Sequence, residues 1–460
     1  MTKNTNVDRM THGERRVAFS LAGVLSTRML GLFMIFPVFA IYARDLEGYT
    51  ATLAGLALGI YGLSQALLQI PLGRLSDKVG RKPIIIGGLL VFILGSVVAA
   101  MSESLWGVII GRAIQGMGAI ASATFALAAD LSREEQRMKV MAVMGMSIGG
   151  AFALALVLGP LLHGFFGLSG IFWVTAVLAA VGILIILFRV PTPVRTRFHR
   201  DAEVEWEWFK RLLTDGQLVR LDIGVFILHL ILTALFMTIP LILHDDIGLP
   251  VDSHWQIYLP VLILSIVMAG PFIMLAEKRR QLRQVTRLAV AGLGISAFGL
   301  WQWSQHIEVI IGMLILFFAS FNVLEAGMPS FIAKVAPAAH KGSAMGGYTS
   351  AQFLGAFVGS VMGGFLHDVA TQQMVFLICG GLVVFWLLLL VGLREPQYCS
   401  SQMLNLGEIT KERAEVLANE LQQITGVVEA VVIPEDGVAY LKVDKHLLDQ
   451  DALYAYSVSQ

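Results

Sequence analysis

Four ionisable side chains lie inside apolar stretches that are long enough to cross a membrane. Burying a charge there is costly, so each such residue is by default a candidate functional group. A carboxyl group at that depth can bind and release a proton near neutral pH, and an imidazole titrates in the same range. The pattern predicts proton transfer that involves the following residues: Arg28, Arg112, His229 and Glu325.

Each of these residues also has a purely structural interpretation. Glu325 would not titrate if it formed a permanent ion pair with Arg28 or Arg112. His229 would not exchange protons if it were a hydrogen-bonded core histidine. Arg112 would have only a structural role if its hydrogen bonds served to link helices. The interpretations differ in whether the carboxyl group and the imidazole exchange protons.

A charged segment bounded by glycines reads GRLSDKVGRKP over residues 73–83. Its glycines permit a tight turn and a close approach of helices. A loop selected only for positive charge would contain lysine and arginine, but not an aspartate and two glycines at these intervals. Asp130 ends the fourth apolar stretch, on the side of the membrane where the segment 73–83 also lies, so an ion pair between Asp130 and Arg81 is geometrically possible. The residues of the segment that we single out are Gly73, Arg74, Asp77, Gly80 and Arg81.

A glycine–proline pair with a further glycine lies in the fifth apolar stretch. Gly159 and Pro160 predict a bend in a helix, and together with Gly164 they allow a neighbouring helix to come close. Gly359 and Gly364 repeat this spacing in the eleventh stretch, and a phenylalanine follows in both places. The repeat favours an architecture of two related halves that face each other.

Twelve apolar stretches position these groups, and their composition places them in a membrane. The chain is 56% hydrophobic and 14% charged, whereas soluble domains carry about 25% charged residues. Each stretch reaches the length of about 20 residues that a bilayer-spanning helix needs. The stretches are 17–43, 51–73, 83–101, 104–130, 139–164 and 168–190 in a first set, and 221–243, 255–276, 285–304, 307–334, 342–366 and 371–393 in a second.

The loops between these stretches differ in charge, which predicts their orientation. Lysine and arginine gather in one set of loops and aspartate in the other, so both termini are expected in the cytoplasm. The net charge is zero, and nothing suggests a nucleic-acid partner. We predict five segments: a tail over 1–16, a six-helix half over 17–190, a linker over 191–220, a second half over 221–393 and a soluble domain over 394–460.

The two cytoplasmic segments have their own patterns. The linker alternates aromatic and charged residues, as an amphipathic helix on the inner leaflet does, although a solvated linker would also fit. The soluble domain predicts a strand over 403–406, a helix over 411–424, strands over Val427–Ile433 and Val438–Val443, and a helix over 446–454. This order suggests a small α+β ferredoxin-like domain. Two cysteines, Cys379 and Cys399, are too poorly placed for a disulfide framework or a metal site.

The segment 73–83 matches motif A of the major facilitator superfamily at every defining position. Residues 112–116 resemble its motif B, whose buried arginine, here Arg112, is associated with proton coupling. Residues 155–164 resemble motif C of the antiporters, with Ala155 and His163 in place of two glycines. The chain thus resembles the drug/proton antiporters of this family, which implies an all-α membrane protein of twelve helices in two pseudo-symmetric halves.

The resemblance also implies how such a protein moves. In the family the motif A aspartate faces the start of the eleventh helix, here near 342–343, where the helix dipole attracts a carboxylate. We predict that Asp77, Arg81 and Asp130 form a latch that holds the halves together on the inner side. We also expect side chains of the central cavity to face a hydrophobic substrate: Phe33, Phe36, Gln115, Met237 and Asn322.

The function predicted from the sequence is proton-coupled export of small hydrophobic or drug-like compounds by alternating access in a bacterial inner membrane. No nucleotide-binding motif is evident, so a proton gradient, and no cofactor or metal, would drive it. The alternatives are a facilitator or proton symporter that imports a small metabolite, and a membrane sensor that signals through its tail. The expected partners are lipid, protons, a small-molecule substrate and an unknown ligand or protein that regulates transport through the soluble domain.

Overall fold

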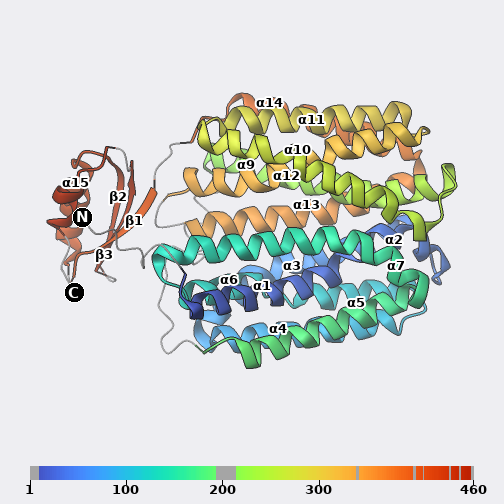
Figure 1. The fold of residues 1–460 in the computed structure, drawn as a ribbon, viewed down its shortest axis with the longest axis horizontal. Coiled ribbons are helices and arrows are strands. Elements are labelled where there is room, and N and C mark those ends of the chain that lie inside the picture. Colours follow the sequence, from blue (N-terminus) through green and yellow to red (C-terminus); the bar gives the residue numbers. More distant parts are fainter. Residues whose placement is uncertain are drawn as a thin grey trace.

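The computed structural model describes residues 10–192, 214–337, 341–396, 400–407, 409–434, 437–444 and 447–456. Long helices run side by side in one bundle, and a small sheet with its own helices lies at one end of that bundle (Figure 1). The bundle end next to this small domain is called the tail-side end below, and the other is called the opposite end.

The first half of the bundle begins inside the segment predicted as a tail, because Thr11 caps a helix that starts at His12. Two of the predicted stretches are broken. Residues 34–35 separate α1 from α2, and residues 118–120 separate α5 from α6. The elements are α1 (His12–Phe33), α2 (Phe36–Tyr42), η1 (Ala43–Asp45), α3 (Ala51–Val79), α4 (Arg81–Ala100), α5 (Leu105–Met117), α6 (Ala121–Asp130) and α7 (Glu134–Arg189).

The second half starts beyond the linker, whose predicted amphipathic helix falls on 193–213, outside the described residues. Asp215 caps its first helix by accepting hydrogen bonds from two backbone amides. The elements are α9 (Gly216–Leu241), η3 (Ile242–Asp246), η4 (Val251–Ser253), α10 (Trp255–Lys278), α11 (Leu282–Trp303), α12 (Ile307–Val335), α13 (Lys341–Val369) and α14 (Gln372–Val391).

Ten helices in the described part of the chain are long and apolar enough to cross a membrane. One of them includes most of α7, whose helical backbone is interrupted at Gly167 (φ 66°), between the predicted stretches 139–164 and 168–190. α11 is a helix of 22 residues but is not among the ten. Large apolar side chains on the outside of the bundle, such as Leu67, Ile110 and Leu388, are more than half exposed. Such an extended apolar surface fits contact with lipid.

Helix α13 lies between the two halves and packs closely against α3 on one side and α9 on the other (Figure 1). The contacts depend on glycines, because a Cβ atom at Gly55 of α3 would collide with the Ser360 carbonyl group. A Cβ atom at Gly355 would likewise collide with the Phe226 carbonyl group of α9. Small residues allow the backbones of membrane helices to approach in this way.

The small domain at the tail-side end is a three-stranded antiparallel sheet in the order β1-β3-β2. Its strands are β1 (Ser400–Asn405), β2 (Val427–Ile433) and β3 (Val438–Val443), accompanied by α15 (Lys411–Gln422) and α16 (Gln450–Tyr454). The last two predicted strands are confirmed at their bounds. Leu421 of α15 and Leu441 of β3 are fully buried in its core.

Candidate functional site

The segment 73–83 places a charged cluster at the tail-side end. α3 ends at Gly80, whose φ of 105° favours glycine, and α4 begins at Arg81. The Arg81 guanidinium donates hydrogen bonds to Asp77 and, at 2.7 Å, to the Ser76 hydroxyl group. Its Nε atom lies 3.4 Å from Oδ2 of Asp130, whose side chain is fully buried at the end of α6. Arg81 therefore connects three helices.

Two further residues of the segment 73–83, Gly73 and Arg74, lie on α3 before the Arg81 cluster. A Cβ atom at Gly73 would lie 3.0 Å from the Ser122 hydroxyl group, so this glycine permits the close contact of α3 with α6. Arg74 is exposed, and Ser343 near the start of α13 is fully buried. The predicted approach of Asp77 to 342–343 and the role of the cluster as a latch stay predictions.

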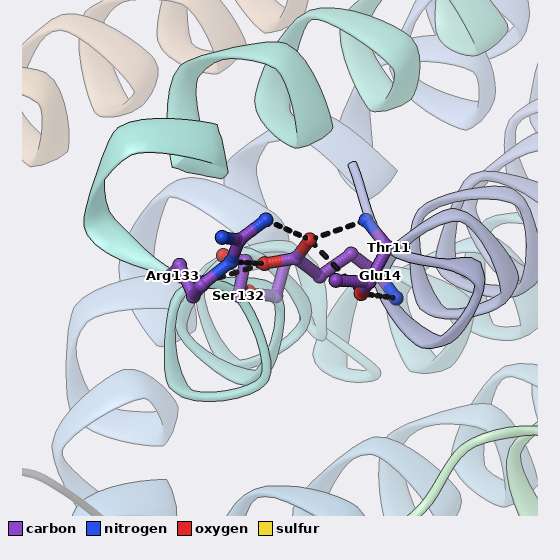
Figure 2. A network of polar contacts seen from close by, with 5 residues as sticks. Thr11, Glu14, Ser132 and Arg133 are labelled. Atoms are coloured by element: carbon purple, nitrogen blue, oxygen red, sulfur yellow. Dashed lines mark hydrogen bonds and ion pairs between the residues drawn. The ribbon is translucent and has the colours of Figure 1, made fainter. Parts of the chain in front are cut away.

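A second ionic contact, which the sequence analysis missed, lies at the same end (Figure 2). Glu14 accepts hydrogen bonds from the Arg133 backbone amide and Nε at 3.1 and 2.9 Å. Its other oxygen accepts a hydrogen bond from the Thr11 amide at 2.8 Å and completes a capping box. Since Arg133 precedes α7 and follows Asp130 by one turn, the contact fastens the loop beside the Arg81 cluster to α1. The Thr-x-x-Glu pattern was the available signal for the cap.

The first half also buries two arginines, and both donate hydrogen bonds to neutral groups of the protein. Arg28 donates hydrogen bonds to Gln65 Oε1 (2.7 Å) and the Gly118 carbonyl group (3.1 Å). Arg112 donates to the Leu58 carbonyl group (3.2 Å) and to Gln115 Oε1 (3.0 Å). Both guanidinium groups lie against the Tyr61 ring, at 5.7 and 5.1 Å from its centroid. Dipoles and an aromatic face thus stabilise these cations.

The second half brings an acid and an imidazole together. Oε2 of Glu325 on α12 lies 3.6 Å from Nε2 of His229 on α9. The Gln352 amide of α13 contacts both, at 2.8 Å from His229 Nε2 and 3.4 Å from Glu325 Oε1. The His229 side chain is 9% exposed and that of Glu325 is 40% exposed, so the pair has one buried and one accessible member.

The sequence left open whether Glu325 forms an ion pair with Arg28 or Arg112. Among the described residues, Glu325 pairs with His229 instead. Each arginine is held by groups of the first half. The sequence placed His229 and Glu325 nearly 100 residues apart (325 minus 229) without a pattern that connects them. Packing of α9, α12 and α13 supplies the connection.

The glycine–proline stretch is partly as predicted. A Cβ atom at Gly159 would collide with the Met34 carbonyl group, at the break between α1 and α2. Pro160 lies inside α7, but the backbone leaves the helical region at Gly167 instead. The close approach expected at Gly164 is wrong, because a Cβ atom there would meet nothing within 4 Å. His163 stacks on Tyr42 with ring centroids 3.3 Å apart.

The residues predicted to line a cavity fall into two groups. Phe33 and Phe36 belong to an aromatic cluster that crosses between the halves. The ring centroids of Phe33 and Phe152 of α7 are 5.0 Å apart, and those of Phe36 and Phe236 of α9 are 5.6 Å apart. Three others have recorded contacts within their own half. They are Gln115, which donates to Ser96 at 2.7 Å, Asn322, which donates to Ser265 at 3.3 Å, and Met237, which packs beside Gly363.

Polar contacts join the halves at the opposite end. Arg44 forms two hydrogen bonds with Asp245, of 3.1 and 2.6 Å. The Asp368 carboxylate at the end of α13 accepts hydrogen bonds from the Ala51 and Thr52 amides, at 3.0 and 2.8 Å. A carboxylate at the start of α3 is favoured by that helix's dipole. None of these residues was singled out in the sequence, since loop charges give no indication of their partners.

Comparison with known proteins decides the family. The family model described as Major Facilitator Superfamily matches residues 21–324 and 282–402. The chain belongs to the major facilitator superfamily. It is 40% identical over 448 residues to the inner membrane transport protein YajR of Escherichia coli K12, a match that covers 96% of this chain and 97% of YajR.

More distant members of the superfamily agree with this assignment. The multidrug resistance protein MdtH of Yersinia enterocolitica is 26% identical over 79% of this chain and 90% of its own length. The crystal structure of the human organic anion transporter MFSD10 shares the fold, with a TM-score of 0.63 at 20% identity, over 83% of this chain and all of that one. The protein is therefore an integral membrane transporter of this superfamily and not an enzyme.

Proposed function

We propose that this transporter exports small hydrophobic or drug-like compounds in exchange for protons, by alternating access. The observation that carries the proposal is the contact of Glu325 with His229, 3.6 Å apart. A proton on the carboxyl group would remove the attraction between Glu325 and a charged imidazole, and its loss would restore that attraction. A proton can therefore change how α12 and α9 hold each other.

The two ends of the bundle supply the gates in this proposal. Arg81, with Asp77 and Asp130, would stabilise closure of the tail-side end. Arg44 with Asp245, and Asp368 at the start of α3, would stabilise closure of the opposite end. Alternating access then requires that the two sets of contacts break in turn. Arg28 and Arg112 would keep a fixed positive charge in the half that faces the carrier.

The proposed substrate class rests on the surface between the halves. Phe33, Phe36, Phe152 and Phe236 form a continuous aromatic cluster there. Aromatic faces bind apolar compounds and weakly bind organic cations. The relatives named MdtH, which are multidrug resistance proteins, agree with this class.

We further propose the topology that the sequence predicts. The ten long apolar helices become twelve when α11 is counted and α7 is treated as two helices that meet at Gly167. The tail-side end and both termini would face the cytoplasm of a bacterium, with the chain in its inner membrane, as the name of the relative YajR suggests. The domain over 394–460 would be a regulatory ferredoxin-like module for an unknown ligand or protein.

One observation favours a second candidate, a facilitator or a proton symporter that imports a metabolite. His163 replaces a glycine of the antiporter motif and stacks on Tyr42, and Gly164 makes no close contact. The stretch departs from the antiporter pattern at Ala155 and His163, which bears on the direction of transport.

The test is proton movement in liposomes that contain the purified protein and a pH-sensitive dye, while lipophilic cations and neutral hydrophobic compounds are added. We expect a transported compound to trigger proton flux in the wild type and about 100-fold less flux in Glu325→Gln. Glu308→Gln is the matched control, since this acid is exposed at the start of the same helix. A compound that is transported without any proton movement would exclude coupling and favour the facilitator.

A further inference from the structure

Asp222 is an acidic residue inside the second half for which the proposed cycle has no role. It lies six residues after the start of α9 at Gly216 (222 minus 216), which is about 9 Å into the bundle from the tail-side end. The residue is half-buried, and its Oδ1 atom is buried without a hydrogen-bond partner among the described residues. A buried carboxylate oxygen without a partner is costly, which calls for a functional explanation.

The packing of α9 against α13 shows what Asp222 faces. Gly355 contacts the Phe226 carbonyl group and Gly359 contacts that of Leu230, so both contacts have an offset of 129 residues (355 minus 226, 359 minus 230). Both helices start at the tail-side end, and they therefore run in parallel. One turn nearer that end, the same offset places Asp222 beside residue 351, next to the turn of α13 that holds Tyr348.

Tyr348 lies on α13 on the turn next to Asp222 and one turn before Gln352. Its side chain is buried, and its hydroxyl group has no hydrogen-bond partner among the residues that the structure describes. The carboxylates of Asp222 and Glu325 both act on this hydroxyl group electrostatically. Gln352, one turn further along α13, contacts Glu325 and His229. Polar groups thus follow one line from the tail-side end to the carrier.

We propose that Asp222 is the proton-relay residue through which Glu325 exchanges protons with the tail-side end, with the Tyr348 hydroxyl group between them. Glu325 would pass its proton to the oxygen of Tyr348 while the proton of that hydroxyl group passes to Asp222. Asp222 would then release a proton to water. Only O–H bonds form and break, and the tyrosine ends neutral, as it began.

This relay gives Glu325 two distinct routes, which is what exchange across a membrane requires. Its Oε2 atom is buried beside His229, whereas 40% of the side chain is accessible. In this structure the Tyr348 hydroxyl group is bonded to neither carboxylate, so the relay is interrupted and does not form a continuous proton leak.

None of the ion pairs in the described part of the chain gives Asp222 a fixed counter-ion. Arg220, two residues before Asp222 on α9, donates to the Gly216 carbonyl group at 2.6 Å. Asp215 caps α9 at its exposed start. Glu325 and Tyr348 approach from α12 and α13, and His229 lies two turns deeper on α9 itself, about 10 Å from Asp222 along the helix axis.

The inference rests on the proposed function, because it assumes that Glu325 titrates, and the experiment separates the two. The full-length protein is reconstituted in liposomes in one orientation, the pH is raised only on the side that the tail-side end faces, and time-resolved infrared spectroscopy follows the carboxyl band that Glu325→Gln removes. We expect Asp222→Asn and Tyr348→Phe to slow the decay of this band about tenfold or more, and Asp222→Glu to restore it to within about twofold. Asp215→Asn is the matched control, since it removes the same charge from the same helix while asparagine retains the cap.

The outcomes have separate meanings. If the band decays at the wild-type rate in Asp222→Asn, the relay is excluded while the proposed function stands. Equal slowing in Asp215→Asn would also overturn the inference, because a general charge effect would then explain both. A wild-type rate in Tyr348→Phe would overturn the path through the hydroxyl group. If Glu325→Gln removes no titrating band, both the relay and the proposed carrier fail.

Discussion

The two halves of the bundle bury ionisable groups of opposite kinds. Arg28 and Arg112 of the first half are at most 1% exposed, and a guanidinium group stays protonated at any ordinary pH. In the proposed cycle, Glu325 of the second half gains and loses a proton beside His229. The first half would then provide a fixed charge and the second a variable one.

The surroundings of the two sets follow from this difference. A fixed cation can be stabilised permanently, and carbonyl groups, glutamine oxygens and the Tyr61 ring do so for both arginines. A group that changes charge needs partners that tolerate both states. Gln352 offers an amide that can donate or accept, and 40% of the Glu325 side chain is accessible. In the proposed cycle, the partners of each group, and not its burial alone, distinguish a structural charge from a proton carrier.

The largest effect is expected when the fixed charge of the first half is removed by Arg112→Met, a substitution that conserves much of the side-chain volume. We expect proton-coupled transport to fall about 100-fold or more, because the fixed charge of the first half is lost and the Leu58 carbonyl group and Gln115 Oε1 lose their donor. Transport assays on the purified variant, with thermal unfolding to verify the fold, measure this. Arg287→Met is the control, since Arg287 near the start of α11 also donates to helix carbonyl groups, those at the end of α14. Normal transport in Arg112→Met would make Arg112 a purely structural tie.

The variable charge is tested by His229→Gln, which retains a hydrogen-bonding group but cannot titrate. We expect about a tenfold loss of proton-coupled transport and a flatter dependence on pH across the range where an imidazole titrates. The pH profile of transport in liposomes is the measurement. His306→Gln, at the exposed cap of α12, is the matched control. An unchanged pH profile in His229→Gln would assign titration to Glu325 alone.

Arg81 differs from the other two buried arginines of the first half, because it is paired with carboxylates and not with neutral groups. Asp130→Asn retains hydrogen bonding but removes one of its two carboxylates, so we expect opening of the tail-side end to become about tenfold more frequent, or about 1.4 kcal/mol. Distances between spin labels across that end report the populations. Combination with Arg81→Met should be non-additive, and additive effects would show that Arg81 and Asp130 act independently.

The smallest effect is expected where a charge pair joins the halves in solvent. The side chains of Arg44 and Asp245 are 33% and 29% exposed, and exposed pairs contribute about 0.2–1 kcal/mol. We expect Arg44→Gln to shift the opening of the opposite end about two- to fivefold, with a smaller shift at high salt. The same label measurements at this end, with and without salt, test it. A shift as large as that of Asp130→Asn would make this pair equal to the Arg81 cluster.

Some features of the site were readable from the chain because they are local. The turn at Gly80 follows from the freedom of glycine at positive φ, and Asp77 and Arg81 lie close together because they flank this turn. The strands Val427–Ile433 and Val438–Val443 were predictable from β-branched residues on either side of a turn. Asp222 was overlooked because it lies at the edge of an apolar stretch, where boundaries read from sequence are uncertain.

The sequence by itself determined that this protein spans a membrane, that it carries motif A, and which ionisable residues lie within its apolar stretches. Hydrophobic length and charge are properties of single segments, and a membrane imposes the same requirement on each of them. Only the tertiary structure decided that Glu325 meets His229 rather than an arginine, and that α9 and α13 pack in a register that brings Asp222 next to the turn of Tyr348. Those pairings depend on the register between helices far apart in the chain, which is set by close contacts such as that of Gly355 with Phe226.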